Sequence, residues 1–321
     1  MRELTYAQAI NEALHEEMAA DSSVLVMGQD IHLPLLPPVH EGLLQRFGPL
    51  RVRSTPASDA ALVGAAVGAA LTGLKPVVAI GLADLLAACV DEIHNQAAKW
   101  RYVHGGKASV PLVIRAPAGA LGGGAEHSQC PEGLFLGSPG LKIALPSTPA
   151  DAKGLLKAAV RDDDPVLVFE HKRLYSTAGP VPEGDGLVPL ARAAVRREGS
   201  DVTIIATSYQ CLLALEAAEE LARQGINAEV IDPRTLVPLD TQTIIASVAK
   251  TGRVVIVHEP NRRGGPGAEV AALLCEQAFP YLRAPVARVA PPDVPVPYSP
   301  ALQSLYLPSA QTIVQAVKGL L

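Results

Sequence analysis

One uncharged segment of small residues limits what this chain can fold into more than any other feature. Residues 55–77 read TPASDAALVGAAVGAALTGLKPV, and between Ala60 and Leu74 no side chain is charged or larger than leucine. The run is shorter than the roughly 18 to 20 apolar residues that a bilayer requires, so it predicts a helix within a folded protein. Ser58 or Asp59 can cap its start, and a Gly and a Pro near its end stop it.

This predicted helix is apolar on every side, so we expect it to be buried on every side. It is either an ordinary core helix or a subunit-interface helix whose N-terminus holds the acid of Asp59 inside a ligand site. Gly64 and Gly68 lie four residues apart and allow another backbone to approach closely. The spacing therefore predicts that this face lies in a subunit contact.

Composition narrows the class of protein. The chain has 321 residues, which predicts two domains, and its 49% hydrophobic content with only 4% aromatic residues indicates a core of Ala, Val, Leu and Ile. Such a chain buries surface against partners as well as against itself. The net charge of −5 comes without basic clusters, which argues against nucleic acid as a partner.

The cysteines and the N-terminus indicate a cytoplasmic protein with no membrane association. The four cysteines lie far apart, with no CxxC and no His at zinc spacing, so they read as reduced thiols. Met1 is followed by Arg-Glu-Leu-Thr and an amphipathic segment rather than by a signal peptide.

Short β-branched runs alternate with Ala-rich helical runs, which predicts an α/β protein made of two doubly wound domains with parallel sheets. The predicted domains are residues 1–175 and 194–321, joined by a Pro/Gly-rich linker at 176–193. Helices are expected near 5–20, 40–47, 59–73, 84–103, 149–161, 209–225, 240–250 and 267–282. Strands are expected at SVLVMG, KPVVAIG, VPLVIRAP, LKIALPS, PVLVFEH, DVTIIATS, NAEVIDPRT, RVVIVHE and PVARVAPPD.

Two glycine motifs are weak evidence for ligands. GDG at 184–186 resembles the start of a diphosphate-and-magnesium motif, but it follows no predicted strand and no Asn comes before Asn227, so we interpret it as a turn. RRGGPGAEVAALL at 262–274 opens a helix after a strand and suits an anion site, although it matches neither GxGxxG nor a P-loop. Such turns are common, and the structural interpretation of this motif is favoured.

The loop GALGGGAEHSQCPEGLF at 119–135 carries a stronger signal. It follows the strand VPLVIRAP and delivers His127 to the carboxyl edge of a predicted parallel sheet, where open α/β folds bind ligands. Histidine suits proton transfer near neutral pH. A lone His is usually structural, but its position favours a functional role here.

The chain resembles, almost from end to end, the β-subunit of the thiamine-diphosphate-dependent decarboxylating component of 2-oxo acid dehydrogenase complexes. The segments that carry the resemblance are TPASDAALVGAAVGAALTGLKPV, DEIHNQAAKWRYVHGG, EHSQCPEGLF, VIDPRTLVPLD, VAKTGRVVIVHE and DVPVPYSPALQSLYLP. The resemblance implies a transketolase-like fold with a pyrimidine-binding domain and a C-terminal domain. Acetoin-cleaving complexes have a closely related β-subunit and remain an alternative.

The resemblance implies a cofactor shared between subunits of an α2β2 heterotetramer. The α-subunit binds the diphosphate and Mg²⁺, which explains why a diphosphate motif is missing here, and the β-subunit supplies the pocket for the aminopyrimidine ring. Asp59 falls where the family has a glutamate that hydrogen-bonds the ring nitrogen and thereby activates the cofactor. Gln29, Leu85 and Ala88 fall at other cofactor-binding positions.

Further roles follow from the resemblance. His127 falls on the histidine of the family's HSQ motif, which positions the substrate carboxylate or assists acyl transfer to the lipoyl group of the acyltransferase core. The substrate is a 2-oxo acid. The C-terminal domain serves subunit assembly and docking of that core. The family's potassium site maps onto Leu112, Ala159, Val160, Asp162 and Asp164, a set that otherwise reads as a plain strand end and an acidic turn.

The departures from the family pattern gather in the expected active site. Asp59 is one methylene shorter than glutamate, and a misplacement of about 1 Å can cost about 100-fold in rate. A second acid is replaced by Gln29, an aromatic residue by Leu85, and a polar or aromatic residue by Ala88. These changes suggest either an unusual substrate or a weakened assembly or regulatory paralogue.

Overall fold

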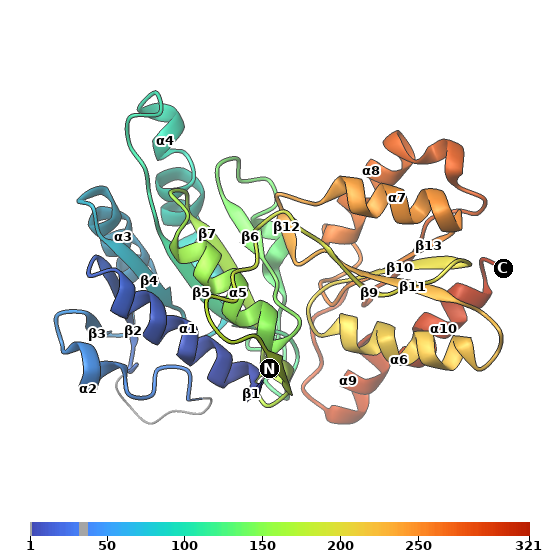
Figure 1. The fold of residues 1–321 in the computed structure, drawn as a ribbon, viewed down its shortest axis with the longest axis horizontal. Helices are drawn as coiled ribbons and strands as arrows, with labels where there is room; N and C mark the ends of the chain where they lie inside the picture. The colour runs from blue at the N-terminus through green and yellow to red at the C-terminus, as the bar shows by residue number, and fades with distance from the viewer. Residues whose placement is uncertain (1, 32–37) are drawn as a thin grey trace. The chain divides into compact units, whose positions relative to one another are not determined.

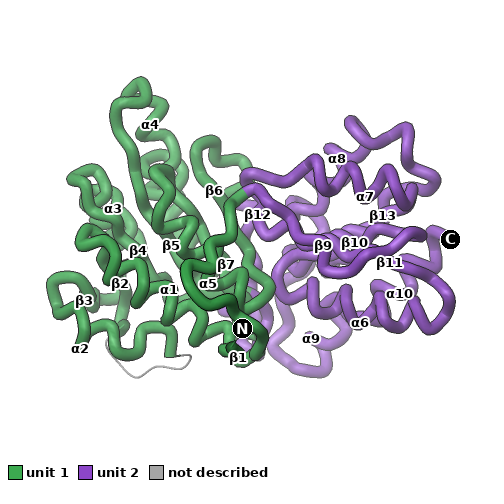
Figure 2. The backbone as a smooth tube through the Cα atoms, in the orientation of Figure 1, with its two compact units in different colours: residues 1–118, 135–190 green, residues 119–134, 191–321 purple. Residues whose placement is uncertain are grey.

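The computed structural model describes residues 2–31 and 38–321, and these residues form two compact units. Unit 1 contains residues 1–118 and 135–190, and unit 2 contains 119–134 and 191–321 (Figure 2). The break after residue 190 lies inside the linker predicted at 176–193. The glycine-rich loop at 119–134 is grouped with unit 2, although it follows a strand of unit 1.

Unit 1 is a layered α/β structure whose parallel strands run in the order β6-β7-β5-β4-β2-β3 (Figure 1). Its main elements are α1 (Tyr6–Ala20), β2 (Val24–Gln29), α2 (Leu43–Phe47), β3 (Val52–Thr55), α3 (Asp59–Leu71), β4 (Lys75–Ala79), β5 (Val113–Ala118), β6 (Lys142–Ala144), α5 (Pro149–Val160) and β7 (Val166–His171). The central strands are buried on both faces, as a parallel sheet requires.

The direction of winding reverses within this sheet. The chain goes from β2 to its neighbour β3 through α2, and then crosses back through α3 to β4 on the other side of β2. Because such crossovers are right-handed, the reversal puts α2 and α3 on opposite faces of the sheet. The helices α1 and α5 pack against each other, and α3 packs against β4 and the segments that follow it.

Unit 2 has a five-stranded sheet in the order β14-β13-β10-β11-β9, in which only β9 is antiparallel to its neighbour. Its elements are η3 (Pro131–Leu134), β9 (Ala194–Arg197), β10 (Val202–Ala206), α6 (Gln210–Ala222), β11 (Ala228–Asp232), β12 (Thr235–Val237), α7 (Thr241–Thr251), β13 (Val254–Val257), α8 (Pro266–Gln277), η5 (Phe279–Tyr281), β14 (Ala287–Val289), α9 (Pro300–Tyr306) and α10 (Ala310–Lys318). Aliphatic side chains of α6, α10, β10 and β13 share one core.

Some local predictions were wrong. The helix expected at 84–103 is broken into the 3-10 segment η1 (Ala83–Cys89), the π-helical segment η2 (Glu92–Ala97) and the short helix α4 (Trp100–Val103). The linker contains strand β8 (Ala178–Val181), which follows η4 (Lys172–Leu174) and pairs antiparallel with β1 (Arg2–Thr5). The π-helical turn is of interest because such turns frequently occur at functional sites.

The helix α3 is buried on one face only within this chain, which corrects the expectation that it is buried on every side. Leu62, Val63, Ala66, Val67 and Ala70 are buried, whereas Ala61, Gly64, Ala65 and Gly68 are exposed. A Cβ at Gly68 would meet no atom within 4 Å. The exposed face therefore consists of the small residues for which we expect a subunit contact.

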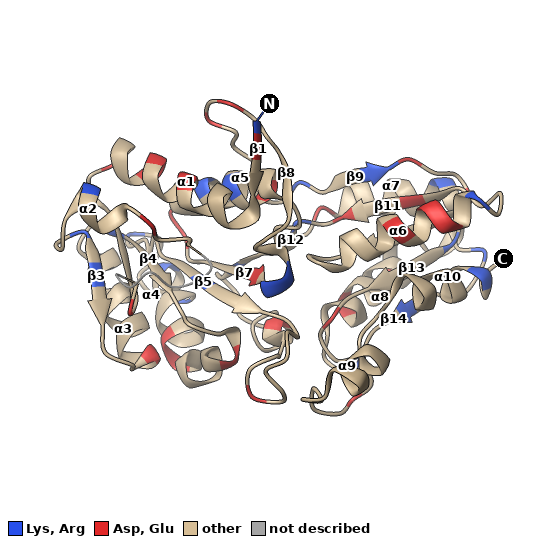
Figure 3. Ribbon diagram, turned by 90° about the horizontal axis from the view of Figure 1, so that it is seen from below, with Lys and Arg blue, Asp and Glu red and all other residues tan. Residues whose placement is uncertain are grey.

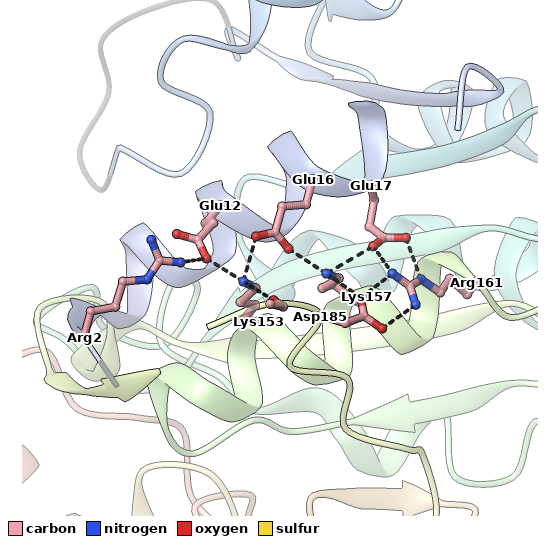
Figure 4. A network of polar contacts seen from close by, with 9 residues as sticks. Arg2, Glu12, Glu16, Glu17, Lys153, Lys157, Arg161 and Asp185 are labelled. Atoms are coloured by element: carbon pink, nitrogen blue, oxygen red, sulfur yellow. Dashed lines mark hydrogen bonds and ion pairs between the residues drawn. The ribbon is translucent and has the colours of Figure 1, made fainter. Parts of the chain in front are cut away.

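A charge network joins α1 to α5 (Figure 4). Figure 3 shows acidic segments on α1 and basic segments on the neighbouring α5. The buried Lys153 donates to Glu12 at 2.5 Å and to Glu16 at 2.8 Å, and Lys157 donates to Glu16 at 2.6 Å. Because each buried ammonium faces carboxylates, the two helices can pack closely without an unpaired charge.

The GDG turn belongs to the same network. Arg161 binds the Asp185 carboxylate through two nitrogens at 2.6 and 2.9 Å, and Lys157 lies 2.8 Å from it. Hydrogen bonds from Arg161 and then Lys157 hold the pKa of Asp185 below its usual range. These contacts support the interpretation of GDG as a turn that joins the segment after β8 to α5.

Among the described residues, none of the helices is both long and apolar enough to cross a membrane. The four cysteines form no disulfide with one another there. Cys89 and Cys211 are buried, Cys130 is partly buried and Cys275 is exposed.

We predict that Gly68→Leu blocks assembly without destabilising the isolated chain. The added side chain meets open space within the chain, and leucine favours a helix more than glycine by roughly 0.5 to 1 kcal/mol. Light scattering should show loss of the wild-type oligomer, with the melting temperature of the monomer unchanged or raised. Ala222→Leu, at an exposed position of α6, is the control. A normal oligomer for Gly68→Leu would contradict the interface assignment.

Candidate functional site

The reversal of winding places a crevice between the carboxyl ends of β2 and β4, where open α/β sheets bind their ligands. Gly28 of β2 pairs with Ala79 at the end of β4, and Gln29 follows at the rim. A cavity of about 160 Å³ lies here. Its lining residues are Gln29, Ile31, Val39, His40, Ala79, Ile80, Gly81, Arg115, Pro117, Glu170 and Tyr175.

A buried ion pair forms the inner wall of this cavity. Arg115 of β5 donates to both carboxylate oxygens of Glu170 on the adjacent β7, at 2.6 and 2.9 Å, and both side chains are almost fully buried. The Tyr175 hydroxyl donates to Glu170 at 2.7 Å. Burial raises the pKa of Tyr175 well above its ordinary value, and the negative charge of Glu170 raises it further. The side chain of Tyr175 is therefore a neutral phenol.

His40 completes the polar wall. An Arg115 nitrogen donates to Nε2 of His40 at 3.0 Å, and arginine has no acceptor, so Nε2 carries no proton. Burial lowers the pKa of His40, and the positive charge of Arg115 adds to this effect, so that the pKa is about 3. At neutral pH this histidine is therefore uncharged.

Asp59 lies in the first turn of α3, after β3. Ser58 occupies the N-cap position, but its side chain makes no capping hydrogen bond. The acidic residue in the first turn of the helix is Asp59. The N-terminus of a helix favours a negative charge, and the Asp59 carboxyl is only partly buried. Burial raises the pKa of the Cys89 thiol on η1 to about 12, and the negative charges of Asp59 and Glu92 contribute to the shift.

The other expected cofactor positions lie on the same edge of the sheet. Gln29 ends β2 and is exposed, with its side-chain nitrogen 3.2 Å from Asp30. Leu85 and Ala88 lie on η1, after β4, and both are exposed. The structure thus brings Gln29, Asp59, Leu85 and Ala88 to the carboxyl ends of three neighbouring strands, in the order β3-β2-β4.

His127 lies in the loop that is grouped with unit 2, and its side chain is exposed. Glu259, which follows β13, anchors the start of this loop by accepting from the Ala120 backbone nitrogen at 2.7 Å and from Gln210 at 2.9 Å. A Cβ at Gly123 would lie 2.7 Å from the Cβ of His127, so the loop needs glycine there. The histidine is presented on an anchored loop.

Glu132 lies in the same loop and is fully buried. Burial, and then the charge of Glu259, raises the pKa of Glu132 to about 8. The raised pKa favours the protonated form of Glu132, which carries no charge to repel Glu259.

Two glycines of the turn at 262–267 pack against the side chain of His258 within unit 2. Gly265 is the N-cap of α8, and Cβ atoms at Gly265 and Gly267 would lie 2.6 and 2.5 Å from the buried His258 ring. The glycines are therefore needed to seat the ring under the helix, which supports the structural interpretation of this motif.

The residues expected at a potassium site have partners within the chain. Lys142 donates to both carboxylate oxygens of Asp162 at 2.7 Å, and Arg101 pairs with Asp164. The carbonyl oxygen of Leu112 accepts from the Val166 backbone nitrogen at 2.9 Å, and that of Ala159 accepts from the Asp162 backbone nitrogen at 3.2 Å. Val160 is a buried residue at the end of α5. Potassium binding by the carbonyl oxygens stays a prediction, because the carboxylates already face cations.

The sequence did not lead us to His40, Arg115, Glu170 and Tyr175. A signal was present for two of them: Arg115 and Glu170 are charged residues within VPLVIRAP and PVLVFEH, strands that read as buried on both faces. A charged side chain in such a strand requires a partner of opposite charge, and Arg115 and Glu170 are each other's partner. Nothing in the local pattern indicates that His40 would join them.

Both units match known families. Residues 2–177 match the family described as "Transketolase, pyrimidine binding domain", and residues 191–313 match "Transketolase, C-terminal domain". A solved structure described as "Split gene transketolase, inactive beta4 tetramer" is 27% identical, with a TM-score of 0.81 over 99% of this chain and 98% of that one.

Characterised relatives are similar over the whole chain. The acetoin:2,6-dichlorophenolindophenol oxidoreductase subunit beta of Bacillus subtilis is 44% identical over 100% of this chain and 98% of its own length. The 2-oxoisovalerate dehydrogenase subunit beta of the same organism is 43% identical, with coverages of 100% and 99%. The mitochondrial pyruvate dehydrogenase E1 component subunit beta-1 of Arabidopsis thaliana is 45% identical, with coverages of 99% and 89%.

We predict that Glu170→Gln lowers the free energy of unfolding by about 3 to 5 kcal/mol, because it leaves the buried Arg115 without a counter-charge. Replacing both partners, as Arg115→Met with Glu170→Leu, should restore most of the loss. Urea unfolding of Glu170→Gln, of the single variants Arg115→Met and Glu170→Leu, and of the double variant that combines those two measures this. A double variant that is as unstable as the two single losses added together would contradict the pairing.

We predict that Glu132 makes the protein less stable as the pH rises. Its pKa is raised in the folded state, so the stabilisation is complete below the ordinary pKa near 4.5 and is lost as the pH rises toward about 8. For one group, the free energy of unfolding changes by at most about 1.4 kcal/mol per pH unit. Glu132→Gln stays neutral and should flatten the pH profile of unfolding between pH 5 and 8. An unchanged slope in this variant would assign the dependence to other groups.

Proposed function

Because the chain belongs to the family of β-subunits of the decarboxylating component of 2-oxo acid dehydrogenase complexes, we propose that it works with an α-subunit in an α2β2 heterotetramer that oxidatively decarboxylates a 2-oxo acid. The observation that carries this proposal is sequence identity of 43–45% over 99–100% of the chain to β-subunits from pyruvate, 2-oxoisovalerate and acetoin systems. The acyl group would pass to the lipoyl group of an acyltransferase core.

The cofactor of this family is thiamine diphosphate, and the carboxyl edge of unit 1 suits its aminopyrimidine ring. The edge combines one acid, Asp59, with the exposed apolar side chains of Leu85 and Ala88 and the amide of Gln29. The α-subunit would hold the diphosphate and Mg²⁺. Thiamine diphosphate supplies, when bound, a carbon nucleophile that accepts the electrons released as CO2 leaves.

The chain's own residues would then have separate roles. Asp59 would share a proton with the pyrimidine ring nitrogen, Leu85 and Ala88 would exclude water from the ring, and Gln29 would contact the ring's polar edge. His127, exposed on its anchored loop, would position the substrate carboxylate or transfer a proton during acyl transfer.

Two alternatives have specific support. Acetoin as substrate is favoured by relatives from Bacillus subtilis and Cupriavidus necator, at 44% and 45% identity, whose names specify acetoin. A weakened assembly or regulatory subunit is favoured by the departures at Asp59, Gln29, Leu85 and Ala88. Such a subunit would form a stable complex whose affinity for thiamine diphosphate does not change with Asp59→Ala.

Co-production with the α-subunit tests the enzymatic role. Ferricyanide reduction should depend on thiamine diphosphate and proceed with pyruvate, a branched-chain 2-oxo acid or acetoin. A well-formed heterotetramer that turns over none of these substrates would contradict the enzymatic proposal and favour the assembly role.

We predict that Asp59→Asn nearly abolishes proton exchange at the thiazolium carbon of the bound cofactor, because an amide keeps the size of the side chain but lacks its acidity. Deuterium exchange in the reconstituted complex measures this. Asp91→Asn, at an exposed position before η2, is the control. If Asp59→Asn and wild type exchange equally fast, Asp59 serves the helix terminus alone.

We predict that His127→Ala lowers the lipoate-dependent rate by roughly 100-fold or more, the usual scale for a proton-transfer group. Cofactor affinity should change little, because the α-subunit would hold the diphosphate. His104→Ala, which removes another exposed histidine, is the control. Parallel losses of rate and cofactor affinity would mark His127 as structural.

A further inference from the structure

The cavity at the ends of β2 and β4 has polar walls but no net charge. Arg115 and Glu170 neutralise each other, Tyr175 is a neutral phenol, and His40 is uncharged at neutral pH. The ring of Tyr6, on α1, lies edge-on to Tyr175 at 5.8 Å between ring centroids. Asp30 faces Gln29 at the rim. The polar residues that line this cavity therefore offer no uncompensated positive charge to a carboxylate.

The ion pair fixes where the proton of His40 lies. Nε2 accepts from Arg115, so a neutral imidazole must carry its proton on Nδ1. No hydrogen bond joins Nδ1 to another residue within 2–31 and 38–321. His40 is only partly buried and lines the cavity, so its Nδ1–H is available as a donor there.

The chain of contacts holds this donor rigidly. Glu170 fixes the guanidinium of Arg115 through two hydrogen bonds, and Tyr175 fixes Glu170 through a third. The guanidinium in turn orients the His40 ring. A donor whose tautomer and direction are set before binding loses little entropy when a ligand arrives, which favours affinity.

We propose that His40 is a binding residue of this cavity, which shares Gln29 with the proposed cofactor edge, and that its Nδ1–H donates to an uncharged acceptor atom of the ligand. Such an atom is either the ring nitrogen of an aminopyrimidine or the carbonyl oxygen of a small hydroxyketone. The volume of about 160 Å³ is below the 300 to 1,000 Å³ typical of pockets for larger ligands, so it suits one ring or one small molecule. This inference rests on the proposed function and adds to it a residue and a ligand chemistry.

Two amide variants separate the roles of the two ring nitrogens. In His40→Asn the side-chain amide lies near the Nδ1 position and keeps a donor toward the cavity. In His40→Gln the amide reaches the Nε2 position and keeps an acceptor for Arg115. A residue that serves only to pair with Arg115 is replaced best by Gln, whereas a ligand donor is replaced best by Asn.

Direct binding measures the effect without turnover. Calorimetric titration of the full-length chain, alone and with its α-subunit, uses thiamine, acetoin and pyruvate as separate probes. We expect thiamine or acetoin to bind, His40→Gln to weaken that binding by roughly 3- to 10-fold, the usual worth of one hydrogen bond, and His40→Asn to stay within about twofold of wild type. Binding of thiamine assigns the acceptor to a ring nitrogen, and binding of acetoin assigns it to the hydroxyketone.

Several results would overturn the proposal. These are failure of both thiamine and acetoin to bind wild type, tighter binding of pyruvate than of either of them, or equal losses in the two variants. Nitrogen NMR of labelled histidine gives an independent check, since the proton must lie on Nδ1 of a neutral His40 at pH 7. Thermal melting confirms that each variant folds. Absence of catalytic turnover alone would contradict the proposed function and leave these binding results intact.

Discussion

A parallel sheet must be covered on both faces, and this constraint determines where chemistry can occur in unit 1. To cover both faces, the chain winds from β2 to β3 and then back across β2 to β4. The connections that leave β2 and β4 therefore diverge to opposite faces, and their divergence opens a crevice at the carboxyl edge of the sheet. The position of the site thus follows from the need to bury the strands.

The crevice is polar because two charged residues on buried strands, Arg115 and Glu170, lie at its inner wall. An arginine and a glutamate on two fully buried strands would each destabilise the fold alone, but at 2.6 and 2.9 Å they neutralise each other. Their hydrogen bonds extend outward to Tyr175 and His40. The same contacts that make the core stable therefore orient the groups that face the cavity.

The sequence predicted the fold class well and the site only in part. The α/β alternation was confirmed because buried parallel strands are short apolar runs, which are easy to recognise, and because the family segments are specific. Leu85 and Ala88 were predicted to lie on one regular helix, but the segment that carries them changes from 3-10 to π geometry. Local periodicity does not reveal such changes, and both segments pack against α3, which is distant from their own sequence pattern.

Contacts between residues distant in the sequence explain what was missed. His40 and Arg115 are 75 residues apart, and Arg115 and Glu170 are 55 residues apart. A local sequence pattern cannot reveal contacts between residues that are so far apart in the sequence. The burial of α3 was overestimated, since the fold of this chain covers only one face of the helix. Burial of the other face in a subunit contact stays a prediction. The roles of Asp59 and His127 stay proposals.

The location of the pyrimidine ring tests the central claim most directly. The measurement is an experimental structure of the heterotetramer with thiamine diphosphate bound. We predict that the aminopyrimidine ring lies at the carboxyl ends of β2 and β4, with the Asp59 carboxylate bound to a ring nitrogen directly or through one water. A ring bound elsewhere, or an Asp59 carboxylate directed away from it, would contradict the assignment of this edge as the cofactor site.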